Sequence, residues 1–304
     1  MGINSAVRTD LAVEARELWT ESAGKTTKLA GVEAHDGTVE GYKTTVVRIL
    51  DENGERELSK PRGTYVTVEI DSLIDREADA FGRGARAVAA ELKSMTRLAP
   101  GDTVLAVGLG NPSVTPDAVG PRAMRYTMVT NHLVDRFPES FGAFRRVAAL
   151  ETGVMGTTGI ESVELIRAVT EKLHPALVIA VDALASRRFG RLCRTVQIAD
   201  TGIVPGSGVG NSRAAIDKAT LGVPVIAVGV PTVVDAGTLA SDLSSRAGVN
   251  FLPPEDYRRF GGDMIVTPKD IDAKVGDIAK LVGYGINLAL HDGLTVEDVN
   301  MMVS

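Results

Sequence analysis

The chain is poor in three features that would assign it to common functional classes. Cys193 is the only cysteine among 304 residues, so no intrachain disulfide and no cysteine-based metal cluster can form. Aromatic residues make up only 4% of the chain, which argues against an aromatic-rich binding face. The formal charge of −6 argues against a general nucleic-acid binder, whose surface must neutralise phosphates.

Long apolar runs are also missing. Glycine or charged residues interrupt every candidate stretch before it reaches the length of a membrane span. The N-terminus lacks the apolar core of a secretory signal peptide. We therefore expect a cytosolic protein that contacts neither the membrane nor, directly, nucleic acid.

Although the net charge is negative, one stretch of the chain is densely basic. It contains Arg187, Arg188, Arg191 and Arg194. Because charge runs usually face water, a solvated stretch beside a strand is favoured over a binding patch. Cys193 lies among these arginines, which can lower the pKa of a thiol. We favour a packed structural cysteine.

The remaining composition is that of a folded globular protein, with 44% hydrophobic and 24% charged residues. The length fits two domains or one α/β domain with an appendage. Residues 1–30 are polar apart from a short helical stretch near Leu11–Trp19, and we interpret them as a detachable or loosely docked arm. Residues 31–70 alternate in short segments around Asn53-Gly54, a strong hairpin signal, and predict a small antiparallel β appendage. A helix is expected over residues 76–98.

The rest of the chain repeats one pattern: an apolar run, a loop with glycine or an acid, then a helix. The runs are residues 103–108, 146–150, 177–181, 195–198 and 223–229. Most are continuously apolar, as strands covered on both faces require. The expected helices are residues 121–137, 161–173, 212–220, 233–243 and 269–291. The pattern predicts an α/β fold with a mostly parallel, doubly wound sheet flanked by helices.

Active sites in such sheets lie beyond the carboxyl ends of the strands, and an acid follows each run. These acids are Asp117, Glu151, Asp182, Asp200 and Asp235. Asp235 and Glu161 are better explained as helix caps or first-turn acids, and Asp200 as a turn residue. Asp182 directly continues an apolar run, so we favour a functional carboxylate in a dry crevice. For Asp117 the residues alone leave a functional and a structural role equally open.

Two carboxylates that converge in a dry site cannot easily both ionise, so the pKa of one rises. A protonated acid beside a base can activate water and protonate a leaving amine, which is the chemistry of peptide hydrolysis. The glycine-rich loops offer rival interpretations. Gly108-Leu-Gly110-Asn111 is a weak nucleotide signal, and Gly206–Asn211 can form a backbone nest for an anion or a peptide carbonyl. No cofactor is expected, and no serine lies in a nucleophile-elbow pattern.

Several long motifs together resemble one known family, the germination protease (spore endopeptidase) of endospore-forming bacteria. The motifs are residues 7–15 (VRTDLAVEA), 107–121 (VGLGNPSVTPDAVGP), 153–161 (GVMGTTGIE), 179–187 (IAVDALASR), 200–211 (DTGIVPGSGVGN), 229–236 (GVPTVVDA) and 266–272 (VTPKDID). The resemblance covers nearly the whole chain. It implies cleavage of small acid-soluble spore proteins during germination, in the spore core.

The resemblance also implies site residues and assembly. The family is classed with atypical aspartic peptidases, and its two essential aspartates fall on Asp117 and Asp182. Its fold is related to that of hydrogenase-maturation proteases, in which acids at matching strand ends bind metal, and it assembles as a homotetramer. The residues that we expect to bind substrate or support these aspartates are Gly108, Gly110, Asn111, Glu151, Asp200, Gly208 and Asn211.

Members of the family are made as zymogens that remove their own N-terminal segment. Family substrates are cut between an acid and a large apolar residue followed by Ala, and Asp10-Leu11-Ala12 has this order. We therefore expect self-cleavage between Asp10 and Leu11, with residues 1–10 as a propeptide-like arm and residues 11–304 as a single catalytic domain. An inert polar tail is the alternative. The region between Asp242 and Met264 is shorter than expected for the family, which bears on subunit packing and zymogen control.

Two other functions remain open from the sequence. A metal-dependent maturation-type protease would use Asp117 and Asp182 as hard oxygen ligands, although no histidine is placed to complete a transition-metal site. A non-catalytic module would use the glycine loops to hold an anion.

Overall fold

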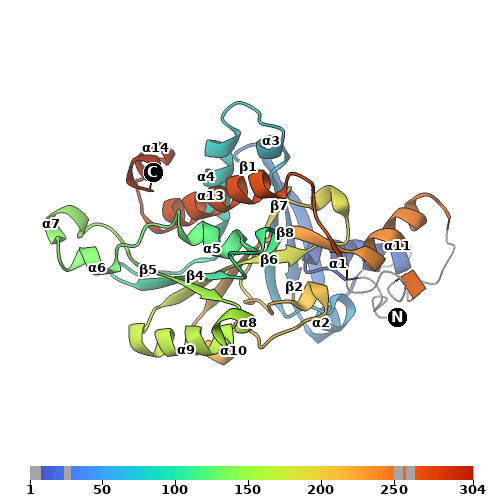
Figure 1. Cartoon of the computed structure of the whole chain (residues 1–304), viewed down its shortest axis with the longest axis horizontal. Helices are drawn as coiled ribbons and strands as arrows, with labels where there is room; N and C mark the ends of the chain where they lie inside the picture. The colour runs from blue at the N-terminus through green and yellow to red at the C-terminus, as the bar shows by residue number, and fades with distance from the viewer. Residues whose placement is uncertain (1–7, 24–28, 250–255, 258–263, 304) are drawn as a thin grey trace.

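A single sheet organises the molecule, and helices cover both of its faces (Figure 1). The structure is a computed structural model that describes residues 8–23, 29–249, 256–257 and 264–303. In the described residues the sheet has nine strands. Their spatial order is β1 (Val32–Val39), β2 (Tyr42–Ile49), β3 (Gly63–Glu69), β7 (Thr195–Ala199), β8 (Val225–Asp235), β6 (Leu177–Ala185), β4 (Thr103–Leu109) and β5 (Arg146–Gly153), with β9 (Ile265–Val266) paired to β8.

The sheet is mixed, so the prediction of a mostly parallel sheet is wrong. Strands β8, β6, β4 and β5 are parallel neighbours, whereas β1, β2, β3, β7 and β8 pair antiparallel. The predicted appendage at residues 31–70 instead continues the sheet, because β3 pairs with β7. The error arose at β7, whose residues are all buried. An apolar run records burial on both faces but not strand direction.

Helices pack on the two faces of this sheet. Helix α4 (Ala80–Met95), α5 (Val119–Met124) and α13 (Ile271–Leu290) share one core with the sheet, and α9 (Ser162–Leu173) and α10 (Lys218–Leu221) lie against the other face (Figure 1). The remaining helices are α1 (Ala12–Ala23), α2 (Glu52–Leu58), α3 (Asp71–Ile74), α6 (Asn131–Val134), α7 (Pro138–Phe141), α8 (Met155–Thr158), α11 (Ala236–Arg246) and α14 (Val296–Val303). Val104 and Leu105 point into opposite cores, as the alternation along a strand requires.

Three local predictions fail, one of a hairpin turn and two of helices. Asn53-Gly54 lies inside α2, since the Asp51 carboxylate accepts hydrogen bonds from the N–H groups of Asn53 and Gly54 at 2.9 and 3.0 Å and starts a helix there. The helix expected over residues 121–137 is split into α5 and α6, and that over 212–220 shortens to α10.

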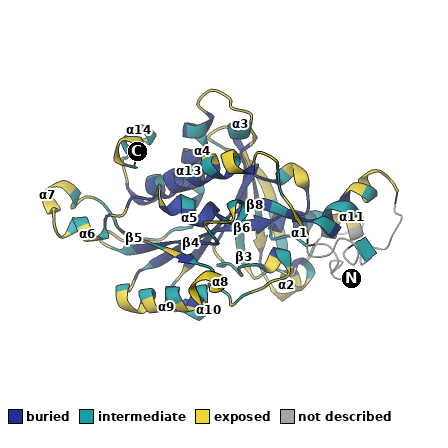
Figure 2. Cartoon of the chain, in the orientation of Figure 1, coloured by how far each residue is buried: buried dark blue, intermediate teal, exposed yellow. Residues whose placement is uncertain are grey.

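Helix α1 is packed against the sheet, so residues 12–23 are not a loosely docked arm. Leu11 and Ala12 have no exposed surface, and Trp19 packs in a cluster with Val47 and Tyr65 from β2 and β3. Figure 2 shows the buried residues concentrated in the sheet and in the helix faces turned toward it. The polar composition of α1 reflects the ion pairs that it makes, described below.

Cys193 is a structural cysteine, as predicted. Its side chain is buried, and burial raises the pKa of the thiol to about 12. Within the residues that the structure describes, no helix combines the length and the apolar character that crossing a bilayer requires.

The close contact of α5 with the sheet is testable at Gly120. A Cβ atom there would lie 2.3 Å from the carbonyl oxygen of Leu109 and 2.4 Å from that of Val181. We expect Gly120→Ala to lower the free energy of unfolding by about 3 kcal/mol, measured by urea denaturation. In α13, Gly276 has open space around it, so Gly276→Ala should raise the same free energy by about 0.5–1 kcal/mol. Equal stability of Gly120→Ala and the parent chain would contradict this packing.

Candidate active site

A cavity of about 600 Å³ lies at the carboxyl ends of the parallel strands. Six of the residues expected at the site from the sequence line it, together with Asp10. They are Gly110, Asn111, Asp117, Asp182, Gly208 and Asn211. The cavity therefore unites the loop after β4, the end of β6 and the Gly206–Asn211 loop, which are far apart in the chain.

Asp182 lies within β6, opposite Gly229 of β8, and is 5% exposed. One carboxylate oxygen accepts a hydrogen bond of 2.9 Å from the N–H of Ala183. Burial, and then the charge of Asp117, raise the pKa of Asp182 well above its usual range. The prediction of a dry setting is confirmed, although β6 continues past Asp182 to Ala185.

Asp117 ends a short 3₁₀ helix, Thr115–Asp117, in the loop after β4. Its carboxylate accepts a hydrogen bond of 2.7 Å from the N–H of Asn111. Burial raises the pKa of Asp117, and this hydrogen bond opposes the rise because it favours the ionised form. Gly110 has φ of +106°, and a Cβ there would lie 2.0 Å from the carbonyl oxygen of Asp117. The glycine-rich loop thus brings Asp117 into place.

Asp10 supplies a third carboxylate to the cavity. Its backbone N–H donates to the carbonyl of Ala185 at 2.9 Å, and one carboxylate oxygen accepts from the N–H of Ala185 at 2.8 Å. The other oxygen accepts from the hydroxyl of Ser207 at 2.6 Å. The charge of Asp10 adds to the rise in the pKa of Asp182. Asp10, at the expected cleavage site, therefore shares the cavity with the two aspartates.

Gln197 was missed by the sequence analysis. Its side-chain Nε2 donates to the carbonyl oxygen of Asp10 at 3.2 Å, and its Oε1 accepts from the N–H of Ala12 at 2.8 Å. This buried amide thus holds the chain on both sides of the Asp10–Leu11 bond. The available signal was a lone amide inside the apolar run of β7, because buried polar groups need partners.

Three residues expected to support the site lie outside the cavity lining. Gly108 is inside β4, where a Cβ would lie 2.5 Å from the carbonyl oxygen of Gly120, so it serves packing. Glu151 is exposed on β5. Asp200 is exposed and accepts a hydrogen bond of 2.7 Å from the N–H of Thr64. Since β7 runs antiparallel to β8, the carboxyl end of β7 lies beside the amino-terminal part of β8. Asp200 therefore lies away from the carboxyl ends of the parallel strands, and the expectation that it shares a site with the other acids is wrong.

The acid after β8 caps a helix, as predicted. The Asp235 carboxylate accepts a hydrogen bond of 2.8 Å from the N–H of Thr238 at the start of α11. In the described residues, no three or more His, Cys, Asp or Glu side chains are grouped as metal ligands.

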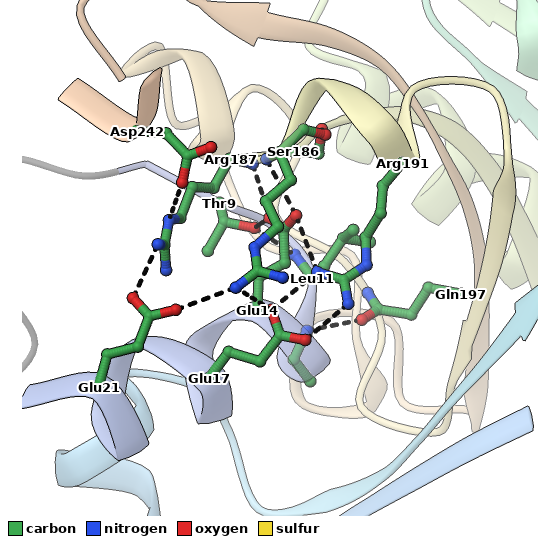
Figure 3. A network of polar contacts seen from close by, with 12 residues as sticks. Thr9, Leu11, Glu14, Glu17, Glu21, Ser186, Arg187, Arg191, Gln197 and Asp242 are labelled. Carbon is green, nitrogen blue, oxygen red and sulfur yellow. Dashed lines mark hydrogen bonds and ion pairs between the residues drawn. The ribbon is translucent and has the colours of Figure 1, made fainter. Parts of the chain in front are cut away.

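An ion-pair network anchors α1 next to the cavity (Figure 3). Glu14, which has no exposed surface, accepts hydrogen bonds from the backbone N–H of Arg187 at 2.6 Å and of Arg188 at 3.1 Å. The Arg187 guanidinium bonds Glu21 at 2.7 Å and Asp242 at 3.1 Å. The interpretation of these arginines as a solvated stretch is therefore wrong for Arg187, which holds α1.

The raised pKa of Asp182 predicts a pH-dependent effect on stability. Below the pKa of the unfolded chain, Asp182 is protonated in both states. As pH rises through the higher folded pKa, the folded chain must ionise a buried acid, and the stabilisation is lost. We expect Asp182→Asn to raise the free energy of unfolding by on the order of 1 kcal/mol at pH 8, with little change at pH 4, by urea denaturation. Glu139→Gln, on the exposed surface of α7, is the control. A gain that is no larger at pH 8 than at pH 4 would refute a buried, protonated Asp182.

Comparisons with known proteins identify the family of this chain. Residues 12–246 match the family model described as Germination protease. The chain is similar to proteins of that name from Caldanaerobacter subterraneus subsp. tengcongensis (43% identity, 98% of each chain), Clostridium perfringens (40%, 98% of this chain and 99% of the relative) and Oceanobacillus iheyensis (39%, 96% of each chain).

The alignment with the Oceanobacillus iheyensis protein spans 353 positions, more than the 304 residues of this chain, so some positions of that relative have no counterpart here. Most of the region predicted to be short, residues 250–255 and 258–263, lies outside the described residues. The family model covers most of the chain, and the relatives match it over nearly their whole length. The chain belongs to the germination protease family, whose name denotes a peptidase of spore germination.

Proposed function

We propose that the chain is an aspartate-dependent endopeptidase that starts the degradation of small acid-soluble spore proteins during germination. One observation carries this proposal: Asp117 and Asp182, both with raised pKa values, line the cavity in which Asp10 is bound. An acid and a base in one dry site can hydrolyse a peptide bond without a covalent intermediate. The spore-protein substrate, the spore-core location and the homotetramer come from the family resemblance.

In this proposal, the different environments of the two carboxyls support different roles. Asp182 is the more deeply buried carboxyl. Burial and the charge of Asp117 both raise its pKa, so in this proposal it carries the proton. Asp117 keeps a hydrogen bond from the N–H of Asn111, which favours its ionised form. In the proposed reaction Asp117 takes a proton from water as the oxygen attacks the carbonyl carbon. Asp182 then gives its proton to the amine as the C–N bond breaks, which leaves a carboxylic acid and a free amine.

The same site acts on the chain itself in this proposal. Residues 1–10 form the arm that is removed, and residues 11–304 form the catalytic domain. Its support is that Asp10 lines the cavity and that Gln197 hydrogen-bonds the chain on both sides of the Asp10–Leu11 bond. The hydrogen bond from Gln197 to the carbonyl of Asp10 also polarises that carbonyl toward attack. Residues 1–7 of the arm lie outside the described residues.

Loss of either carboxylate tests the catalytic assignment. We expect Asp117→Asn and Asp182→Asn each to slow cleavage of a purified small acid-soluble spore protein by at least about 100-fold, because each removes a proton-transfer group. Cleavage is followed by gel electrophoresis and mass spectrometry. Asp135→Asn, which changes an exposed carboxylate paired with Arg146, should cleave at the parental rate.

Two results would overturn this assignment. If both Asn variants cleaved normally, the non-catalytic anion-binding alternative would be preferred. If a chelator abolished cleavage by the parent chain and added metal restored it, the metal-dependent alternative would replace the aspartate mechanism.

Self-cleavage predicts a defined new N-terminus. Incubated full-length chain should yield a species that begins at Leu11, identified by N-terminal sequencing, and Asp117→Asn should remain intact. The physical reason is that Gln197 holds the bond before Leu11 on both sides. A mature protein that begins at any other residue would contradict the assigned bond.

A further inference from the structure

We propose that the backbone N–H of Ala185, the hydroxyl of Ser207 and the bare backbone of Gly208 form a subsite for a carboxylate. The subsite selects an acidic residue on the amino side of the bond to be cut, and Asp10 occupies it in the uncut chain. The inference rests on the proposed function, because it takes this cavity as the place where peptide bonds are hydrolysed. It adds the residues that recognise the acidic side chain of the substrate.

The two oxygens of the Asp10 carboxylate have separate donors. One accepts from the N–H of Ala185 at 2.8 Å, and the other accepts from the hydroxyl of Ser207 at 2.6 Å. Ala185 also accepts from the N–H of Asp10 at 2.9 Å, so the residue is aligned by its backbone as well as its side chain. Hydrogen bonds to an ionised acceptor are shorter and stronger than those between neutral groups. A carboxylate fits this pair of donors, and an apolar side chain would leave both without a partner.

Gly208 makes room for the carboxylate. A Cβ at this position would lie 2.1 Å from the Asp10 carboxylate oxygen and 2.6 Å from the Cβ of Ala185. Both distances are far below van der Waals contact, so any other side chain would push the acid out of its place. The requirement for glycine here is therefore steric.

A positive charge stands close to the subsite. The Lys60 ammonium donates to the carbonyl of Thr9 at 3.4 Å, directly before Asp10 in the chain. Lys60 lines a second cavity together with Asp10 and Ser207. An asparagine could match the two donors only by turning the Ser207 hydroxyl to accept, and it would lose the attraction of Lys60. The subsite thus distinguishes an acid from its amide by charge and from alanine by both hydrogen bonds.

The subsite becomes free when the arm leaves. Helix α1 is held by contacts of its own, among them Glu14 with the backbone of Arg187 and Arg188. The contacts of the Asp10 carboxylate, by contrast, lie on the amino side of the Asp10–Leu11 bond. A cut before Leu11 releases Asp10 and leaves Ala185, Ser207 and Gly208 in place for the acidic residue of a protein substrate.

Hydrogen exchange tests the subsite without relying on catalysis. The full-length chain carrying Asp117→Asn, which keeps its arm in the proposed mechanism, serves as the background. In it we expect Ser207→Ala to speed the exchange of the amides of residues 9–12 about tenfold, which corresponds to about 1.4 kcal/mol, and Gly208→Ala to speed it more. Asp10→Ala removes both hydrogen bonds of the carboxylate, so its effect should be larger than that of Ser207→Ala. Adding Ser207→Ala to Asp10→Ala should change little, because the bond from Ser207 is already lost.

Ser162→Ala is the matched control. Its hydroxyl donates to the carbonyl of Gly153, not to the arm, so arm exchange should stay at the background rate. Far-UV circular dichroism confirms that each variant is folded. Unchanged exchange in folded Ser207→Ala and Gly208→Ala, or effects of Ser207→Ala and Asp10→Ala that simply add, would overturn the subsite.

Self-cleavage of the chain with an intact Asp117 then tests selectivity. Asp10→Asn and Asp10→Ala should slow release of the arm at least tenfold relative to Asp10, and Ser207→Ala should shrink the difference between Asp10 and Asp10→Ala. An equal rate for all three residues would refute selection of an acid. Failure of the catalytic assignment looks different: Asp117→Asn and Asp182→Asn would release the arm at the parental rate, while Asp10→Ala would still slow that release.

Discussion

The burial of the Asp182 side chain is the constraint on which the rest of the site depends. Asp182 sits inside β6, with β4 and β8 as parallel neighbours on its two sides and only 5% of its surface exposed. In this setting ionisation is costly, and a second carboxylate, Asp117, makes it more so. The fold thus favours the protonated form of one acid, which is the form that the proposed proton transfer to a leaving amine requires.

A second buried acid shows how the surroundings decide what a carboxylate does. Glu14 accepts four hydrogen bonds, from Thr9, Arg191 and the backbone of Arg187 and Arg188. Within the described part of the chain, Asp182 accepts one hydrogen bond, from the N–H of Ala183, and the nearby charges that affect its pKa are those of Asp117 and Asp10. Burial with many donors produces an anchor, and burial with few donors produces a reactive acid.

Glu14 and Asp182 lie near opposite sides of the Asp10–Leu11 bond. On the carboxyl side, Glu14 and its arginines tie α1 to the loop after β6 (Figure 3). On the amino side, Asp10 is bound next to Asp182 by Ala185 and Ser207. The segment with the proposed cleavage site is therefore held by contacts at both of its ends, and the helix that follows it belongs to the folded core.

The sequence by itself determined the α/β class, most of the strands and the buried setting of Asp182, because this acid directly continues an apolar run. Asp117 was singled out by the family motifs, since its loop gives no burial signal. Strand direction was decided only by tertiary pairing. Because β7 is antiparallel to β8, Asp200 lies at the opposite strand ends from Asp182. Gln197 and Ser207 acquired their roles in the same way. They meet Asp10 from 187 and 197 positions along the chain, and no local pattern records contacts that only folding brings together.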